Sequence, residues 1–174
     1  MTLLLRAAAA LAAGDVRFAL IGAAAMAAHG VSRSTVDQDV LVTDERVLHA
    51  AFWSTVDASV DVRHGDTADP LAGVVRLDAP GERQVDVVVG RGDWMSRILT
   101  RTPVLAVPGG AMPVADPADL ILLKLYAGGN QDLWDIEQLV AAASDRAALA
   151  SVVEGRLAEA PPECRAQWNL RRSV

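Results

Sequence analysis

Residues 22–39 read GAAAMAAHGVSRSTVDQD, and this stretch decides the fold. It begins with Gly22 at the end of an apolar run and closes on two alternating carboxylates, Asp37 and Asp39. Residues i and i+2 of a strand point to the same face, so these two carboxylates can converge on one divalent cation. A glycine turn that opens a helix offers backbone N–H groups, here of Gly22 and Ala23, to a phosphate. The stretch therefore predicts a metal site beside a phosphate site, a combination suited to reactions of nucleotides.

Hydrophobic periodicity and turn signals on either side of this stretch predict a mixed α/β half followed by a helical half. We expect an α/β (α+β) fold: a small mixed sheet with flanking helices over 1–115, and a C-terminal helical subdomain over 116–174 packed on it. The predicted strands are 16–21, 37–42, 74–77, 84–89 and 103–107, and the predicted helices are 1–13, 23–28, 45–56, a short one from 93, 117–127, 131–143, 145–157 and one after 162.

Local signals support these boundaries. Pro80-Gly81 is a strong turn signal and predicts a hairpin between the strands on either side of it. Asp116-Pro117 is a typical helix start, with aspartate at the N-cap and proline at the first helical position. The same helix is expected to end at Gly128-Gly129.

Composition limits the classes of protein to consider. The chain has 174 residues, enough for one substantial core, and a net charge of −6, which argues against a surface that coats nucleic acid. An RNA acceptor held in a local basic patch stays possible. The single Cys164 suits a reducing compartment. The apolar residues 1–13 are too few to span a bilayer and have no basic segment before them, so we expect a packed helix, a cytoplasmic protein and no membrane partner.

A third carboxylate, Asp86, lies within the valine-rich run QVDVVV over 84–89. An aspartate is costly to bury in such a strand unless it meets a cation or hydrogen-bond donors. Metal-dependent nucleotidyl transfer needs hard oxygen ligands for Mg²⁺ or Mn²⁺, and Asp37, Asp39 and Asp86 can supply them. The alternative for all three is an ordinary solvent-facing position, for Asp86 beside Gln84.

The run from Gly22 to Asp39 resembles the first motif of the polymerase-β-like nucleotidyltransferase superfamily. It is most similar to the minimal bacterial branch that contains the AbiEii toxins, in which a glycine-led helix precedes an Arg-x-Thr-x-Asp-x-Asp stretch. The resemblance covers about Val16 to Val140. It implies metal-dependent transfer of a nucleoside monophosphate from an NTP to an acceptor hydroxyl, with Asp86 as the third carboxylate of the site.

The resemblance also implies nucleotide-binding roles for Arg33, Thr35, Lys124 and Asp135. Arg33 either reaches a phosphate or braces Asp37 or Asp39. Lys124, the only lysine of the chain, is either a phosphate ligand or a surface residue that extends its ammonium into water. Asp135 is either a ligand or a brace behind one. The nearby Asp132 is expected to cap the helix near Gln131.

Two departures from the family pattern leave alternatives open. The phosphate loop of the family usually reads Gly-Gly or Gly-Ser, whereas this chain has Gly22-Ala23, and the basic residues expected before Asp132 are absent. A non-catalytic, antitoxin-like module that binds a partner protein or a nucleotide is therefore the alternative to an enzyme. For an enzyme, the acceptor is an RNA, a protein or a small molecule such as an antibiotic, and a cognate toxin or antitoxin is a possible partner. Antibiotic-modifying relatives are expected to carry a larger helical domain.

Overall fold

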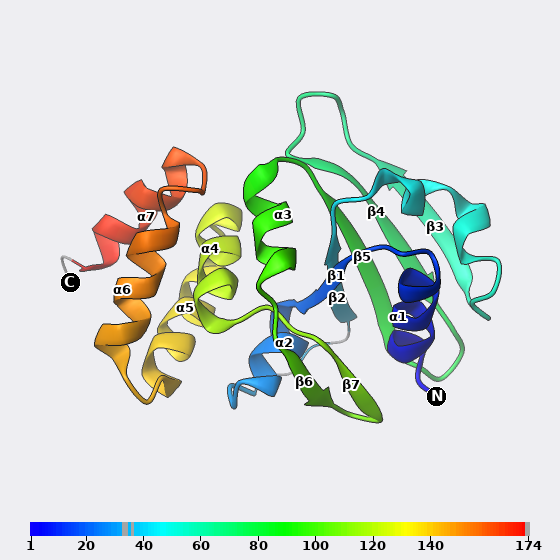
Figure 1. The fold of residues 1–174 in the computed structure, drawn as a ribbon, viewed down its shortest axis with the longest axis horizontal. Helices are drawn as coiled ribbons and strands as arrows, with labels where there is room; N and C mark the ends of the chain where they lie inside the picture. The colour runs from blue at the N-terminus through cyan, green and yellow to red at the C-terminus, as the bar shows by residue number, and fades with distance from the viewer. Residues whose placement is uncertain (33–34, 36, 173–174) are drawn as a thin grey trace. The chain divides into compact units, whose positions relative to one another are not determined.

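The computed structural model describes residues 1–172 except 33, 34 and 36. The chain divides into two compact units, which Figure 1 shows as a ribbon. The first unit comprises Met1–Ala28 and Ser32–Ala115, and the second comprises His29–Val31 and Asp116–Val174. That 1–115 and 116–174 are separate domains stays a prediction. Within the described part of the chain, no helix has both the length and the apolar character needed to cross a bilayer.

The first unit is built on a mixed sheet, which has five strands among the described residues, in the order β1-β2-β5-β4-β3. Strands β2 and β5 run parallel, and every other neighbouring pair is antiparallel. The predicted fold class is confirmed. The strands of this sheet are β1 (Phe18–Ile21), β2 (Asp37–Val42), β3 (Ser59–His64), β4 (Leu71–Asp78) and β5 (Gln84–Gly90).

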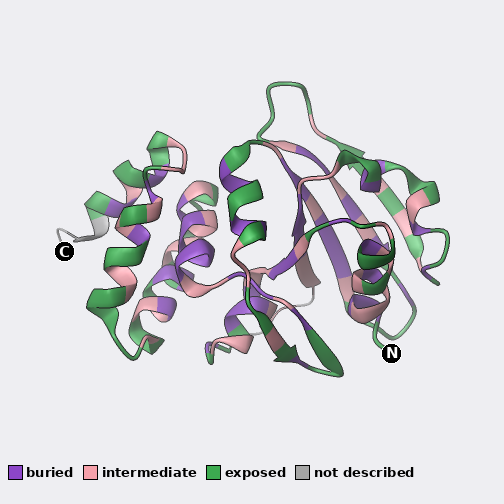
Figure 2. Ribbon diagram, in the orientation of Figure 1, coloured by how far each residue is buried: buried purple, intermediate pink, exposed green. Residues whose placement is uncertain are grey.

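One face of this sheet is the core of the first unit. Val75, Val85 and Val87 are fully buried on it. Figure 2 shows buried segments of the sheet in purple. Each such side chain stabilises the fold by about 1.5–3 kcal/mol. Helix α1 (Leu3–Ala13) contacts β5, and α3 (Asp93–Thr100) contacts β2. The buried stripe of α1 confirms the helix predicted over 1–13.

The helix predicted over 45–56 is wrong. The segment instead forms two 3₁₀ turns, Glu45–Leu48 and Ala50–Trp53, separated by His49 in an extended conformation. The indole N–H of Trp53 donates to the Val47 carbonyl over 2.8 Å. In an α-helix, that carbonyl would accept a hydrogen bond from the backbone N–H of Ala51. Burying Trp53 in the core thus replaces the regular helix.

Two strands of the first unit were not predicted. Strand β3 alternates Val60 and Val62 with polar residues, a period of two that the sequence does contain. Strand β7 (Gly110–Pro113) is antiparallel to β6 (Val104–Val107), so the predicted edge strand is half of a hairpin. Pro108, Gly109 and Gly110 are typical of a loop, so the sequence did not indicate this second strand.

The second unit is helical, and its described helices confirm the predicted ones to within about two residues. Asp116 caps α4, accepting from the Asp119 backbone N–H over 2.9 Å, and Pro117 occupies the first turn. Gly128 ends this helix as predicted. The helices are α4 (Pro117–Ala127), α5 (Asn130–Ala142), α6 (Arg146–Arg156) and α7 (Pro162–Arg172); in the first unit, α2 spans Gly22–Ala28.

Candidate metal and nucleotide site

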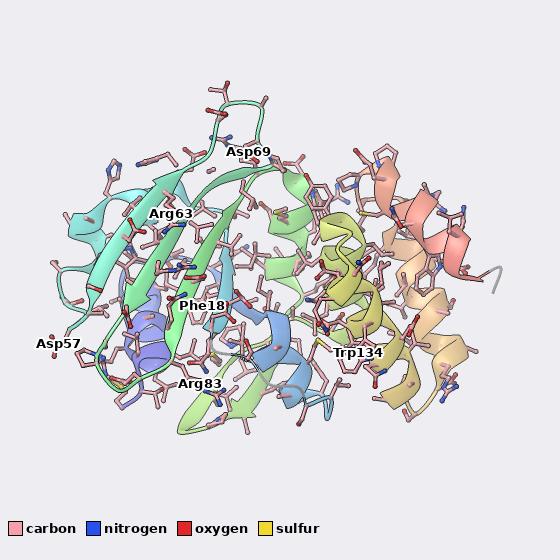
Figure 3. All side chains as sticks on the ribbon, turned by 180° about the vertical axis from the view of Figure 1, so that it is seen from behind. Phe18, Asp57, Arg63, Asp69, Arg83 and Trp134 are labelled. Atoms are coloured by element: carbon pink, nitrogen blue, oxygen red, sulfur yellow. The ribbon has the colours of Figure 1, made fainter. Side chains whose placement is uncertain are left out.

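Three aspartates meet on the face of the sheet opposite its core. Asp37 and Asp39 alternate along β2, and Asp86 on the parallel neighbour β5 lies directly opposite Asp39. The three residues offer carboxylate oxygens that all lie within 4.8 Å of one another. Figure 3 views the sheet from this side, with α1 behind it and the labelled Arg63 of β3 in front. We call Asp37, Asp39 and Asp86 the carboxylate trio.

Arg76 and Gln84 hold the Asp86 carboxylate from two directions. Arg76 on β4 lies opposite Asp86 in the antiparallel register. Its Nε donates to Asp86 Oδ1 over 3.0 Å and its Nη2 to Oδ2 over 2.8 Å, which is a bidentate pair. Gln84 Nε2 donates to the same Oδ1 over 3.1 Å. The hydrogen bonds to Asp86 raise the pKa of Arg76, so the guanidinium stays charged.

The Asp86 side chain lies on the face of the sheet opposite the core, beside Gln84 as the alternative expected, yet the residue is only 8% exposed. Arg76 and Gln84 cover it, so it is not an ordinary solvent-exposed aspartate. Asp37 and Asp39 are half-buried. Burial of a carboxylate is costly without a partner, and Arg76 supplies the partner for Asp86. The trio is thus built into the sheet.

Gly22 lies against Asp39 because β1 and β2 pair with Ile21 opposite Asp39. Gly22 has φ +62, a left-handed conformation that favours glycine. A Cβ built on it would collide with the Asp39 carboxylate oxygen Oδ2. Only a glycine lets the Asp39 carboxylate lie this close to the main chain where α2 begins. The predicted phosphate-binding pair, Gly22 and Ala23, therefore borders the carboxylate trio.

Thr35 reaches the trio through Asp37. Its Oγ1 donates to Asp37 Oδ1 over 2.5 Å and lies 3.1 Å from the Asp37 carbonyl oxygen. Thr35 therefore orients a trio carboxylate, whereas its predicted contact with a nucleotide stays a prediction. Arg33, the other predicted residue of this segment, lies outside the described residues.

Lys124 and Asp135 belong to the second unit and pair there. Lys124 Nζ lies 2.7 Å from Asp135 Oδ2 and 2.9 Å from Asp132 Oδ1. The lysine side chain is 12% exposed and that of Asp135 is 0%, so Lys124 is not a surface residue that extends into water. Burial lowers the pKa of Lys124, but hydrogen bonds to Asp135 and Asp132 outweigh it and raise the pKa above its ordinary value.

Two further side chains complete this cluster of the second unit. Asp132 Oδ2 accepts from the Gly129 backbone N–H over 3.1 Å, which confirms the predicted cap, and its other oxygen holds Lys124. Gln131 Nε2 donates to Asp135 Oδ1 over 3.2 Å. Asp135 thus braces the lysine, and its role as a nucleotide ligand stays a prediction.

The residues of the trio fit a hard divalent cation. Their donors are carboxylate oxygens, which Mg²⁺ and Mn²⁺ prefer. The three carboxylates gather negative charge at one place, and Arg76 pairs with Asp86, so the site suits a divalent cation. Gly22, whose lack of a side chain leaves room for the Asp39 carboxylate, is a second observation that supports a specific site at this place.

The contribution of Arg76 was not foreseen from the sequence, although a signal for it exists. Arginine is an unusual residue in the apolar run Val74–Leu77. The turn over 79–82 joins strands whose register sets Arg76 opposite Asp86. Counting back from the Pro80-Gly81 turn thus pairs the only basic residue of one strand with the only acidic residue inside the other.

Comparisons with known proteins establish the fold. No family model and no curated protein matches the sequence. Among solved structures, ANT(2'')-Ia in complex with adenylyl-2''-tobramycin is 14% identical, with a TM-score of 0.57 over 98% of each chain. The solution structure of ANT(2'')-Ia, described as an antibiotic-resistance factor, is 12% identical with a TM-score of 0.55, over 90% of this chain and 91% of its own.

A third similar structure is JHP933 from Helicobacter pylori. It is 20% identical with a TM-score of 0.50, over 86% of this chain and 68% of its own. At such identities the likeness concerns the fold alone. The chain has the nucleotidyltransferase fold, and its chemistry has to be argued from the carboxylate trio.

Proposed function

We propose that this chain is a metal-dependent nucleotidyltransferase that transfers a nucleoside monophosphate from an NTP to an acceptor hydroxyl. One observation carries the proposal: the carboxylate trio, with all three ligand atoms within 4.8 Å of one another, on the sheet of a nucleotidyltransferase fold. Carboxylates this close repel one another, so a cation bound between them would be favourable.

Asp37, Asp39 and Asp86 are the residues that would hold Mg²⁺ or Mn²⁺. The bound cation supplies charge neutralisation for the triphosphate and orients the attacking hydroxyl. Thr35 fixes Asp37, and Gly22 leaves the room that Asp39 needs. Rate enhancement in such a site comes chiefly from positioning and electrostatic stabilisation.

The reaction forms one bond and breaks one. The acceptor oxygen attacks the α-phosphorus of the NTP, the bond from that phosphorus to the bridging β-phosphate oxygen breaks, and pyrophosphate leaves. A carboxylate of the trio takes the hydroxyl proton. The backbone N–H groups of Gly22 and Ala23 are predicted to contact the outer phosphates, and Arg33 to contact a phosphate or brace the trio.

For the acceptor we favour a small molecule with a hydroxyl group over an RNA or a protein. ANT(2'')-Ia was solved with adenylyl-2''-tobramycin, and the structural match spans 98% of both chains. A chain of this extent is therefore long enough for a fold that holds an adenylylated small molecule, so the expected larger helical domain is not required. A net charge of −6 also suits a cationic acceptor.

A non-catalytic module that binds a nucleotide or a partner protein is the second candidate. The observation in its favour is that the Lys124 ammonium already pairs with Asp132 and Asp135, whereas an enzyme was expected to use this lysine to bind a phosphate. The narrower proposals rest on the sequence. The resemblance suggests an AbiEii-type branch and a role in a toxin–antitoxin or phage-defence system with a cognate partner, and the character of residues 1–13 and the single cysteine suggest a cytoplasmic location.

The test is calorimetric titration of each NTP with Mg²⁺ or Mn²⁺ into the wild type and the Asp37→Asn/Asp39→Asn variant. We expect metal-dependent binding in the wild type and its loss in the variant, with an unchanged circular dichroism spectrum. Asp78→Asn is the matched control, because Asp78 is an exposed aspartate at the end of β4. Equal affinity in the double variant and the wild type would refute the metal site.

A transfer assay follows from the same titration. The preferred NTP, labelled on its α-phosphate, is incubated with tobramycin, with total RNA and with a control lacking acceptor. Label that moves to tobramycin in the wild type and not in the double variant supports the proposed acceptor class, whereas label on RNA rejects it. An absence of NTP binding shifts the assignment to the partner-binding module.

A further inference from the structure

Arg76 lies on β4 beside the carboxylate trio without belonging to it. Its guanidinium joins both oxygens of Asp86, over 3.0 and 2.8 Å, in the planar fork geometry that lysine cannot reproduce. The Arg76 side chain is 38% exposed, whereas that of Asp86 is 12% exposed. The arginine therefore approaches Asp86 from the solvent side of the sheet face and fixes the plane of its carboxylate.

The register makes this contact a property of the sheet. Asp39, Asp86 and Arg76 occupy one row across β2, β5 and β4, because Asp39 pairs with Asp86 and Asp86 pairs with Arg76. Each carboxylate oxygen has two lone pairs. Asp86 Oδ1 accepts from both Arg76 and Gln84, whereas Oδ2 accepts from Arg76 Nη2 and can offer its second lone pair to a cation. Asp86 thus has Asp39, a proposed cation ligand, on one side and Arg76 on the other.

We propose that Arg76 is a positioning residue of the metal site, which acts through Asp86 to present its carboxylate to the cation bound by Asp37 and Asp39. This inference rests on the proposed function. Partners that orient a ligating carboxylate commonly contribute 10–100-fold to metal affinity. The opposing effect is electrostatic: a fixed positive charge repels a cation, so an arginine that did no more than sit nearby would weaken metal binding. The two roles predict opposite signs.

The experiment measures the Mn²⁺ dissociation constant by electron paramagnetic resonance, in the absence of nucleotide, for the wild type, Arg76→Gln and Arg76→Lys. We expect Arg76→Gln to weaken Mn²⁺ binding by about 10–100-fold. Arg76→Lys keeps the charge and loses the fork, so we expect it to recover only part of that loss. Tighter binding or an unchanged constant in Arg76→Gln overturns the proposal, as does full recovery in Arg76→Lys, which would show that the bidentate fork does not position Asp86.

Arg63→Gln is the matched control. Arg63 lies on the same face of the sheet and pairs with Asp61 over 3.0 Å, one strand further from the trio, so its replacement should leave the Mn²⁺ constant unchanged. Circular dichroism and a thermal melt verify that each variant is folded. If Arg76→Gln does not fold, the comparison of Arg76→Lys with the wild type decides, because a weaker Mn²⁺ constant is then required.

A double-mutant cycle with Asp86→Asn separates this proposal from the proposed function. If Arg76 acts through Asp86, Arg76→Gln has no further effect in the Asp86→Asn background. An equal effect in both backgrounds overturns the positioning role. If Asp86→Asn itself leaves Mn²⁺ binding intact, the metal site of the proposed function fails, whereas loss in Asp86→Asn without loss in Arg76→Gln removes only Arg76.

Discussion

At the scale of single residues, each member of the trio has its own local condition. Asp39 needs a neighbour without a side chain, Asp37 is held by the hydroxyl of Thr35, and Asp86 is held by a guanidinium. None of these contacts forms part of a large hydrophobic core. On their own, these three contacts cost stability or contribute little to it. Their evident effect is to orient the carboxylate oxygens as ligands.

Gly22→Ala tests the first of these conditions. The left-handed conformation costs an alanine about 1–2 kcal/mol, and the new methyl group would also displace the Asp39 carboxylate. We expect a lower free energy of unfolding in urea and a loss of metal-dependent nucleotide binding.

Gly81→Ala is the matched control for this substitution. Gly81 has φ +77, so the backbone cost is similar, but no atom lies within 4 Å of its added Cβ. It should lower the free energy of unfolding and leave nucleotide binding intact. If the two variants lose nucleotide binding equally, the contact between Gly22 and Asp39 has no role in the site.

At the scale of elements, two ion clusters tie the helices of the second unit together. Lys124 of α4 binds Asp132 and Asp135 of α5, and Arg156 of α6 lies 2.7 and 2.9 Å from the carboxylates of Asp116 and Asp119. Buried groups of this kind are costly to leave unpaired. Helix packing in this unit therefore depends on a few charges as well as on apolar side chains.

Lys124→Met is the test of the first cluster. It would remove the Lys124 ammonium from the fully buried carboxylate of Asp135, so we expect the free energy of unfolding to fall by about 3–5 kcal/mol. Chemical denaturation followed by tryptophan fluorescence measures the change.

The control for Lys124→Met is Arg63→Gln, which breaks a pair whose side chains are 68% and 56% exposed. Exposed pairs contribute about 0–1 kcal/mol, so the control should be nearly as stable as the wild type. A cost for Lys124→Met as small as that of the control would show that the lysine does not stabilise the helices, and would favour its reading as a phosphate ligand.

At the scale of the whole molecule, charge is the property that bears on the choice of acceptor. The formal charge is −6, and the carboxylate trio adds a local excess of negative charge on one face of the sheet. A field of this sign attracts cationic molecules and repels a polyanion such as RNA. The charge thus favours the small cationic acceptor within the proposed function.

The dependence of transfer on salt tests this argument. Raising the ionic strength from about 0.01 M to 0.15 M shortens the screening length from about 30 Å to about 8 Å. We expect the KM for tobramycin to rise several-fold while kcat changes little, because screening weakens the encounter and leaves the bound complex unaffected. A neutral hydroxylated acceptor serves as the control. Equal salt dependence for both acceptors would mean that charge does not select the acceptor.

The sequence by itself determined most of the helices and strands and part of the site. The alternation of Asp37 and Asp39 fixes both side chains on one face of a strand, and the Pro80-Gly81 turn fixes the hairpin that carries Asp86. Such local rules act over a few residues, which is why the helix from Asp116 to Gly128 was also predicted correctly. The helix predicted over 45–56 failed because burial of a tryptophan outweighed local propensity.

Only the tertiary structure decided what surrounds those residues. Strands β2 and β5 are parallel neighbours although more than 40 residues separate them in the chain, and this pairing brings Asp39 opposite Asp86. The same pairing, with β4 on the other side, puts Arg76 on the third carboxylate. Likewise, the sequence left Lys124 as either a phosphate ligand or a surface residue, and the packing of α4 against α5 places it between two carboxylates. Long-range pairing of this kind depends on the burial of whole faces, and no short stretch of sequence contains it.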